Sequence, residues 1–168
     1  MCIRDRFAHR LAEINLGPCP AAARVPAHPP SCSDVLVNGV TSSELMERIE
    51  RLRLLCWQRA GVDRSVHGMT AALHEIHAQQ QWLQDQPLLN ALQQGPMLLA
   101  DGTRRDLNLL LDYRHRLLTS GLMLEACLFR QESRGGHFRS DAPASLPQWQ
   151  CHSRQNRAQG PHTRAVRR

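Results

Sequence analysis

The sequence predicts an all-α fold, a three-helix bundle with an irregular N-terminal linker and a disordered C-terminal tail. Leucine-rich segments with helical spacing fill its middle, only 4% of the 168 residues are aromatic, and the ten Pro and ten Gly gather mainly outside those segments. Such a composition favours helix over sheet. A chain of this length corresponds to one domain of ordinary size.

The first helix is expected to begin after Thr41 and to end at Gly61. Thr41 and Glu44 have the spacing of a capping box, in which each side chain accepts from the other residue's amide. Glu44 also stands four residues before Arg48, an arrangement that stabilises a helix. The expected apolar face comprises Leu45, Ile49, Leu52 and Cys56.

A second helix is expected after a connection so short that the two helices should run antiparallel. Asp63 is the expected N-cap, and Pro87 should end the helix. A short additional helix is expected between Leu88 and Gly102, because its leucines must be covered. The apolar face of the second helix comprises Met69, Leu73, Ile76 and Leu83.

The third and longest helix is expected over residues 104–133, with Thr103 and Asp106 as a capping pair. Gly121 lies inside it, where glycine is unfavourable by about 1 kcal/mol relative to alanine, so a close approach of two helices is the expected reason for it. The apolar face is wide enough for packing against two other helices. It comprises Leu107, Leu110, Leu111, Leu117, Leu118, Leu122, Leu124 and Leu128.

The polar residues outside these faces predict no catalytic, cofactor-binding or metal-binding residue. His74 and His77 lie three apart on one helix, but zinc needs further ligands, and a solvated pair is the simpler interpretation. The six cysteines contain no Cys-x-x-Cys pair, which favours a reducing, cytoplasmic location over a disulfide framework. No apolar run reaches the ~18 residues of a membrane span, so no membrane partner is expected.

The net charge of +6 comes from 21 basic residues that are all arginine. A phosphate-binding surface would normally include lysine as well. The positive charge is therefore not taken as evidence for nucleic-acid binding, and nucleic acid is not expected as a partner. The arginines after residue 153 lie among Gln, Asn, Gly and Pro, a composition typical of a disordered basic tail.

The end of the third helix leads into the densest group of charged residues in the chain. Two glycines there are expected to end the helix in a left-handed conformation, and arginine forks facing carboxylates can lock such a loop. Two interpretations stay open: a helix end that satisfies its own polar groups, or a surface on which another domain docks. The candidate docking motif comprises Glu132, Arg134, Gly135, Gly136, His137, Arg139 and Asp141.

Residues 130–143, RQESRGGHFRSDAP, resemble the motif that closes the third helix of the C-terminal domain in the succinate dehydrogenase/fumarate reductase flavoprotein family. Residues 57–64, WQRAGVDR, are similar to the end of that domain's first helix. Residues 7–12, FAHRLA, are similar to the helix that leaves the family's FAD-binding domain. The resemblance covers roughly residues 7–155 and implies a helical C-terminal domain.

Within the family the resemblance favours the L-aspartate oxidase branch, since residues 144–149, ASLPQW, replace the Arg-Asp-Asp that follows the motif in succinate and fumarate enzymes. That branch implies FAD-dependent oxidation of L-aspartate to iminoaspartate for NAD biosynthesis, with oxygen or fumarate as electron acceptor. The family's FAD-contacting and substrate-binding residues would precede residue 7. The chain is therefore expected to be a fragment that binds no cofactor and has no activity alone.

The resemblance implies a division into four parts. Residues 1–16 are interpreted as a remnant of a helix of the FAD-binding domain, 17–40 as a linker, 41–143 as the helical domain and 144–168 as an irregular basic tail. The expected partners are the FAD-binding and capping domains of a parent enzyme. Two alternatives are the same domain of a succinate dehydrogenase or fumarate reductase subunit, and a free-standing helical interaction module with a basic tail.

Overall fold

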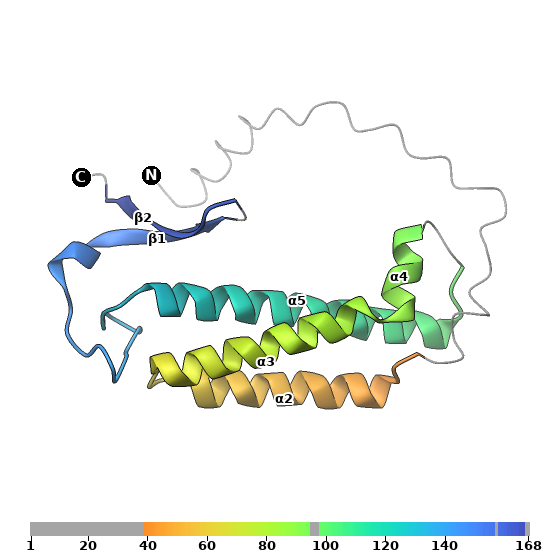
Figure 1. Ribbon diagram of the computed structural model, residues 1–168. Helices are drawn as coiled ribbons and strands as arrows, with labels where there is room; N and C mark the ends of the chain where they lie inside the picture. The colour runs from red at the N-terminus through yellow and green to blue at the C-terminus, as the bar shows by residue number, and fades with distance from the viewer. Residues whose placement is uncertain (1–38, 95–97, 157, 167–168) are drawn as a thin grey trace, which may run out of the picture. The chain divides into compact units, whose positions relative to one another are not determined.

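Three helices that lie side by side form the centre of the domain (Figure 1). The structure is a computed structural model that describes residues 39–94, 98–156 and 158–166. The expected three-helix bundle is thereby confirmed, whereas the helical remnant and most of the linker lie outside the described residues. The bundle consists of α2 (Ser42–Ala60), α3 (Val66–Gln84) and α5 (Asp101–Phe129). The short α4 (Pro87–Gln94) follows α3, as expected.

The beginning of α2 follows the prediction in part. The Thr41 hydroxyl accepts a hydrogen bond from the Glu44 amide at 3.3 Å, and this caps the helix. The Glu44 carboxylate does not return to Thr41; it accepts from Arg48 at 2.8 Å. At the other end Gly61 has φ −69°, so no left-handed conformation requires glycine there. Glycine is required sterically, because a Cβ would stand 2.4 Å from the Trp57 carbonyl oxygen.

The N-cap of α3 is Ser65, and the prediction of Asp63 was wrong. The Ser65 hydroxyl accepts from the Gly68 amide at 3.2 Å. The helix begins later than expected because Arg64 forms an isolated parallel bridge with Arg139. A residue paired in this way cannot join the first turn of a helix, so capping passes to the residue after it.

Helix α5 begins three residues earlier and ends four residues earlier than the predicted 104–133. Its N-cap is Ala100, which makes no side-chain capping bond, so the expected Thr103–Asp106 pair was wrong. Asp106 instead accepts a hydrogen bond from the Ser42 hydroxyl and connects α5 to the start of α2. At the C-terminal end Arg130 turns extended, with φ −82° and ψ 105°.

The core lies where α5 packs against both other helices, as its wide apolar face predicted. Leu107, Leu110, Leu117 and Leu124 are buried there. The predicted face was nevertheless too wide, because Leu118 and Leu122 are 53% and 43% exposed. Both lie about 100–140° around the helix from Leu117, at 3.6 residues per turn, and so point away from the core.

A polar network that the sequence did not predict crosses the bundle. The Arg48 guanidinium stacks 3.8 Å from the centre of the Trp82 ring and donates to the Gln79 side-chain oxygen at 2.7 Å. The buried Tyr113 hydroxyl donates to the same oxygen at 3.1 Å. Because these residues come from α2, α3 and α5, the network fixes how the three helices are placed around their axis.

Two strands form in the C-terminal tail, so the prediction of a disordered tail was wrong for its described residues. After the 3₁₀ turn η3 (Pro147–Trp149), β1 (Cys151–Asn156) and β2 (Gly160–Ala165) pair antiparallel, with Cys151 opposite Ala165. The Asn156 side chain accepts from the amides of Ala158 and Gln159, and Gly160 takes φ +64° to complete the turn. The arginine-rich composition concealed a hairpin whose turn is made by Asn and Gly.

Among the described helices, none combines the length and the apolar character needed to cross a lipid bilayer.

Candidate domain-docking site

The candidate docking motif forms a closed loop after α5. Arg134 and His137 exchange main-chain hydrogen bonds of 2.8 and 3.1 Å, and Gly135 and Gly136 make the tight turn between them. Gly135 has φ +58°, the conformation that glycine adopts most readily. The two glycines were expected to end the helix, but α5 ends at Phe129, and they shape this turn instead.

Glu132 is the buried anion of the loop. Its carboxylate accepts from Arg134 Nε at 2.8 Å and Nη2 at 2.9 Å, from the Leu146 amide at 2.8 Å, and from Arg130. Hydrogen bonds from Arg134 are the main reason that the pKa of Glu132 falls from an ordinary 4.5 to about 2, against the opposing effect of burial. Glu132 therefore stays ionised at any physiological pH and holds both sides of the loop together.

Arg139 is the buried cation, and it closes the C-terminal end of α5. Its Nη1 donates to the carbonyl oxygens of Leu128 and Arg130 at 3.2 and 3.0 Å. Its Nε and Nη2 hold the Asp141 carboxylate at 3.1 and 2.5 Å, and these bonds are the main cause of a lowered Asp141 pKa. A buried guanidinium thus satisfies carbonyls that the helix leaves without intrahelical partners.

His137 connects the loop to the connection between α2 and α3. Its Nε2 donates to the Arg130 carbonyl at 3.2 Å, and its Nδ1 accepts from Arg64 Nη1 at 3.2 Å. Since a guanidinium can only donate, the imidazole must be neutral with its proton on Nε2. Burial is the main cause of the lowered His137 pKa, and nearby arginine charges add to it, so the ring keeps this form at neutral pH.

Three residues that organise the loop were missed as site residues. The Ser133 hydroxyl accepts from the Arg139 amide at 2.9 Å and donates to the Ala142 carbonyl at 2.8 Å. Arg64 contributes its side chain to Gly136 and His137, and its carbonyl accepts from the Ser140 amide at 2.9 Å. Arg130 donates to Glu132 and to the carbonyl of Cys151. Ser133 and Arg130 lie within residues 130–143, but only the fold identifies Arg64 as part of the loop.

The structure brings all seven predicted site residues into one loop, and it separates inward from outward groups. Glu132 and Arg139 are buried and His137 is partly buried, while Arg134 and Asp141 reach the surface with their charges already paired. The turn at Gly135 and Gly136 and the neighbouring Phe138 ring face solvent. Whatever binds this loop would therefore meet backbone and an aromatic ring rather than free charges.

Other candidate chemistry is weak in the described part of the chain. His74 and His77 are exposed on α3, and within this part no three His, Cys, Asp or Glu side chains gather closely enough to hold a metal ion. Burial raises the pKa of the Cys127 thiol, and a protonated thiol is a poor nucleophile. The described strands form a hairpin with no helix after it, so they do not make the strand–turn–helix cradle that binds a dinucleotide.

Comparison with known proteins places this geometry in a family. Residues 49–166, which include the whole loop and the hairpin, match the family described as "Fumarate reductase flavoprotein C-term". An L-aspartate oxidase of Nostoc sp. (strain PCC 7120) is 36% identical over 116 residues, which are 66% of this chain and 20% of that protein. An L-aspartate oxidase of Synechocystis sp. (strain PCC 6803) is 35% identical over 104 residues, 59% of this chain and 19% of that protein.

The chain thus spans about one fifth of the length of these curated relatives. No solved structure matches it significantly. The family match covers more than half of the chain, and it agrees with the helical bundle and with the motif resemblance at residues 130–143. The chain belongs to the family of fumarate reductase flavoprotein C-terminal domains.

Proposed function

We propose that this chain supplies the C-terminal helical domain of an L-aspartate oxidase, which uses FAD to oxidise L-aspartate to iminoaspartate in NAD biosynthesis. The similarity to the L-aspartate oxidases of Nostoc and Synechocystis carries the proposal. Residues 144–149 support it from the sequence, since they lack the Arg-Asp-Asp of the succinate and fumarate branch. The free thiols of Cys56, Cys127 and Cys151 suit a cytoplasmic enzyme.

The proposed role of the domain is to support the flavin-bearing part of the enzyme rather than to act on substrate. The FAD-binding and capping regions are the partners, and FAD is held by them. The loop around Glu132 and Arg139 presents its rigid turn and Phe138 to these regions, while its paired charges keep the turn in shape. Neither nucleic acid nor a membrane takes part.

Reconstitution from two pieces tests this function. The Nostoc enzyme lacking its matched C-terminal region would be mixed with the purified 168-residue chain, and L-aspartate-dependent flavin reduction and product formation would be measured. We expect the truncated enzyme to be impaired and the added chain to restore oxidation of L-aspartate. Succinate serves as the control substrate, and oxidation of succinate in place of L-aspartate would assign the chain to the succinate/fumarate branch.

A flavin titration of the chain by itself completes the test. We expect no stoichiometric flavin absorbance in the purified chain, and no release of FAD when it is denatured. A full equivalent of bound FAD would contradict the supporting role. Salt-sensitive RNA binding that disappears when residues 153–168 are deleted would instead favour a free-standing interaction module.

A further inference from the structure

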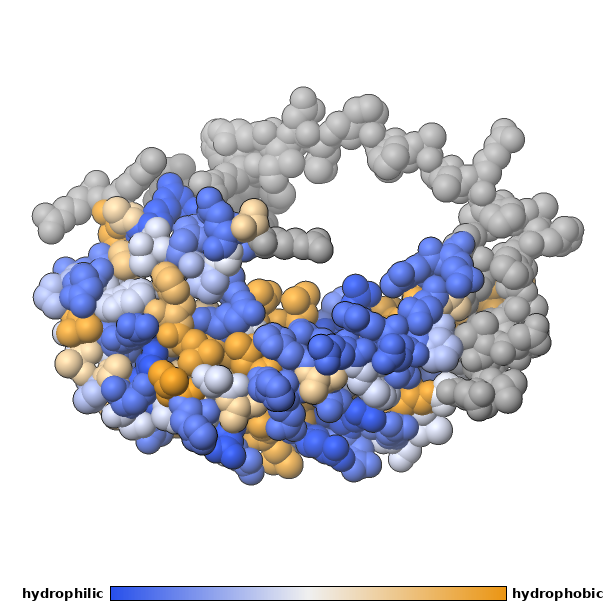
Figure 2. All heavy atoms as spheres, in the orientation of Figure 1, coloured by the Kyte–Doolittle hydropathy of each residue, from blue (hydrophilic) through white to orange (hydrophobic). Residues whose placement is uncertain are grey.

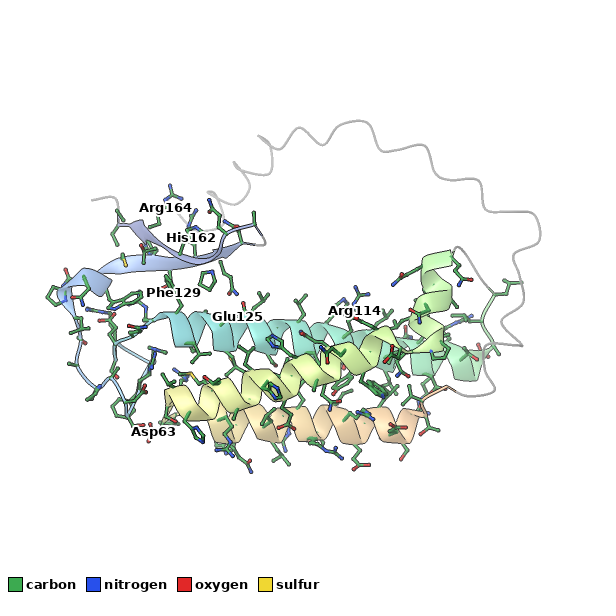
Figure 3. All side chains as sticks on the ribbon, in the orientation of Figure 1. Asp63, Arg114, Glu125, Phe129, His162 and Arg164 are labelled. Atoms are coloured by element: carbon green, nitrogen blue, oxygen red, sulfur yellow. The ribbon has the colours of Figure 1, made fainter. Side chains whose placement is uncertain are left out.

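A second apolar stripe runs along α5 beside the face that packs into the bundle core, and its first residue, Leu111, still touches that core. Leu111, Leu118, Leu122 and Phe129 follow one another at intervals of seven, four and seven residues. At 3.6 residues per turn these four positions fall within about 40° of one another around the helix. Figure 3 shows the labelled Glu125 and Phe129 on the side of α5 that faces the hairpin.

The C-terminal end of this stripe is already covered within the domain. The rings of Phe129 and Trp149 meet edge to face with centres 5.4 Å apart, and Gln155 of β1 donates to Glu125. Figure 2 shows apolar atoms gathered over the C-terminal half of α5, below the hairpin. Further along, Leu118 and Leu122 have no such cover and stay about half exposed.

A groove of about 530 Å³ adjoins the uncovered part of the stripe. Leu83, Leu89 and Leu118 provide its apolar residues, and the rim includes Gln80, Gln84 and Arg114. Leu83 and Leu89 are otherwise buried, so the groove opens directly onto the core. Among the described residues, no carboxylate lies within salt-bridge distance of Arg114.

We propose that this face, defined by Leu118, Leu122, the groove and Arg114, binds the flavin-bearing part of the enzyme through an amphipathic helix. The partner helix places apolar side chains at helical spacing on the leucines and a carboxylate opposite Arg114. Three observations favour this occupant. The face continues a stripe whose C-terminal end is covered by Trp149 and β1, the charged residue that lines its groove is the cationic Arg114, and about four fifths of each relative lies outside the region matched here.

The inference rests on the proposed function, and point variants can show whether the docking face or the proposed function itself is wrong. Leu118→Asp with Leu122→Asp would be made in the full 168-residue chain, with Leu54→Asp on α2 as the matched control, since Leu54 is 45% exposed. Binding to the truncated Nostoc enzyme would be measured by calorimetry. We expect the double variant to weaken binding at least about thirtyfold, as loss of interface anchors does, and the control to change it less than about threefold.

The outcomes are distinct. If the unaltered chain fails to bind the truncated enzyme, the proposed function is wrong. If it binds and the double variant binds equally well, only the docking face is wrong. Circular dichroism verifies that the double variant is folded. If it is unfolded, Arg114→Glu provides the test and should weaken binding at low salt. The control is Arg105→Glu, at an exposed arginine elsewhere on α5, which should not weaken binding. If Arg114→Glu and Arg105→Glu weaken binding to the truncated enzyme equally, the docking face is wrong.

Discussion

Arg134 holds Glu132 through two parallel hydrogen bonds, from Nε to Oε1 at 2.8 Å and from Nη2 to Oε2 at 2.9 Å. Only Ser133 stands between these two residues along the chain, so the pair closes a small ring within the loop. A bidentate arginine–carboxylate pair is stronger and more directional than a single ionic contact. The loop therefore owes its shape to ionised Glu132.

Acid should destabilise the domain through Glu132. The pKa of this carboxyl is about 2 in the folded chain, below its ordinary 4.5, so the unfolded chain binds the proton first. The stabilisation is then complete above about pH 4.5 and disappears as the pH falls toward 2. Urea unfolding followed by circular dichroism between pH 2 and 7 checks this. The Glu132→Gln variant should have a lower free energy of unfolding at pH 7, and this free energy should change less with pH below 4.5 than it does in the unaltered chain. An equal pH dependence in the two chains would contradict the role given to Glu132.

Replacing Arg139 should destabilise the domain strongly. Arg139→Ala removes the Arg139 donor from the Leu128 carbonyl, leaves the Arg130 carbonyl with His137 alone, and leaves Asp141 without its cation. Leaving a buried carbonyl oxygen without its donor lowers the free energy of unfolding by about 1–3 kcal/mol, and loss of the ion pair with the partly exposed Asp141 adds little to this. Thermal and urea unfolding provide the measurement. Arg105→Ala, on the exposed side of α5, is the control and should change stability by less than about 0.5 kcal/mol.

Alanine at two glycines should have opposite effects. At Gly121 a Cβ would meet Gln80 Nε2 at 3.7 Å and Ile76 Cγ2 at 3.8 Å, which is ordinary contact, so Gly121→Ala should stabilise the domain by about 1 kcal/mol. At Gly61 the same atom would stand 2.4 Å from a backbone oxygen, so Gly61→Ala should destabilise by roughly 1–3 kcal/mol. Melting temperatures of both variants test the pair, and a destabilised Gly121→Ala would restore the idea that close helix packing requires this glycine.

Neighbouring leucines on α5 should differ sharply in their sensitivity. Leu117 and Leu124 are fully buried, so truncation of either to alanine should cost about 2–5 kcal/mol. Leu118→Ala, one position away and half exposed, should cost less than about 0.5 kcal/mol in the isolated chain. Chemical denaturation of the three variants gives the comparison. Equal losses at Leu117 and Leu118 would mean that the orientation of α5 is misassigned.

Helical periodicity was sufficient to predict the bundle but not its details. The faces of α2 and α3 and the short α4 follow from spacing, because burial of apolar residues determines helix packing. The sequence could not show how much of the α5 surface is buried. Positions 117 and 118 are both leucine, and only the neighbouring helices determine that Leu117 is buried and Leu118 is exposed. The N-cap of α3 also depended on a distant partner, the bridge from Arg139 to Arg64.

The candidate site was predictable as a segment, and its internal bonds were not. The density of charges and glycines in residues 130–143 indicates a shaped loop, but the sequence does not reveal that Glu132 and Arg139 turn inward. The hairpin was missed because arginine-rich strands of low hydrophobicity resemble a tail. Its pairing depends on the turn at Asn156 and on contacts such as Phe129 with Trp149, which only the folded chain brings together.

The Arg64 carbonyl receives its hydrogen bonds from Ser140, 76 positions later in the chain. During synthesis this carbonyl can bond only to water until Ser140 has been added, after α2, α3 and α5 have all been made. The bonds from the Arg64 side chain to Gly136 and His137 form only at that stage. The contact between residue 64 and the loop is therefore one of the last in the domain that can form, because it joins the segments farthest apart in this part of the chain.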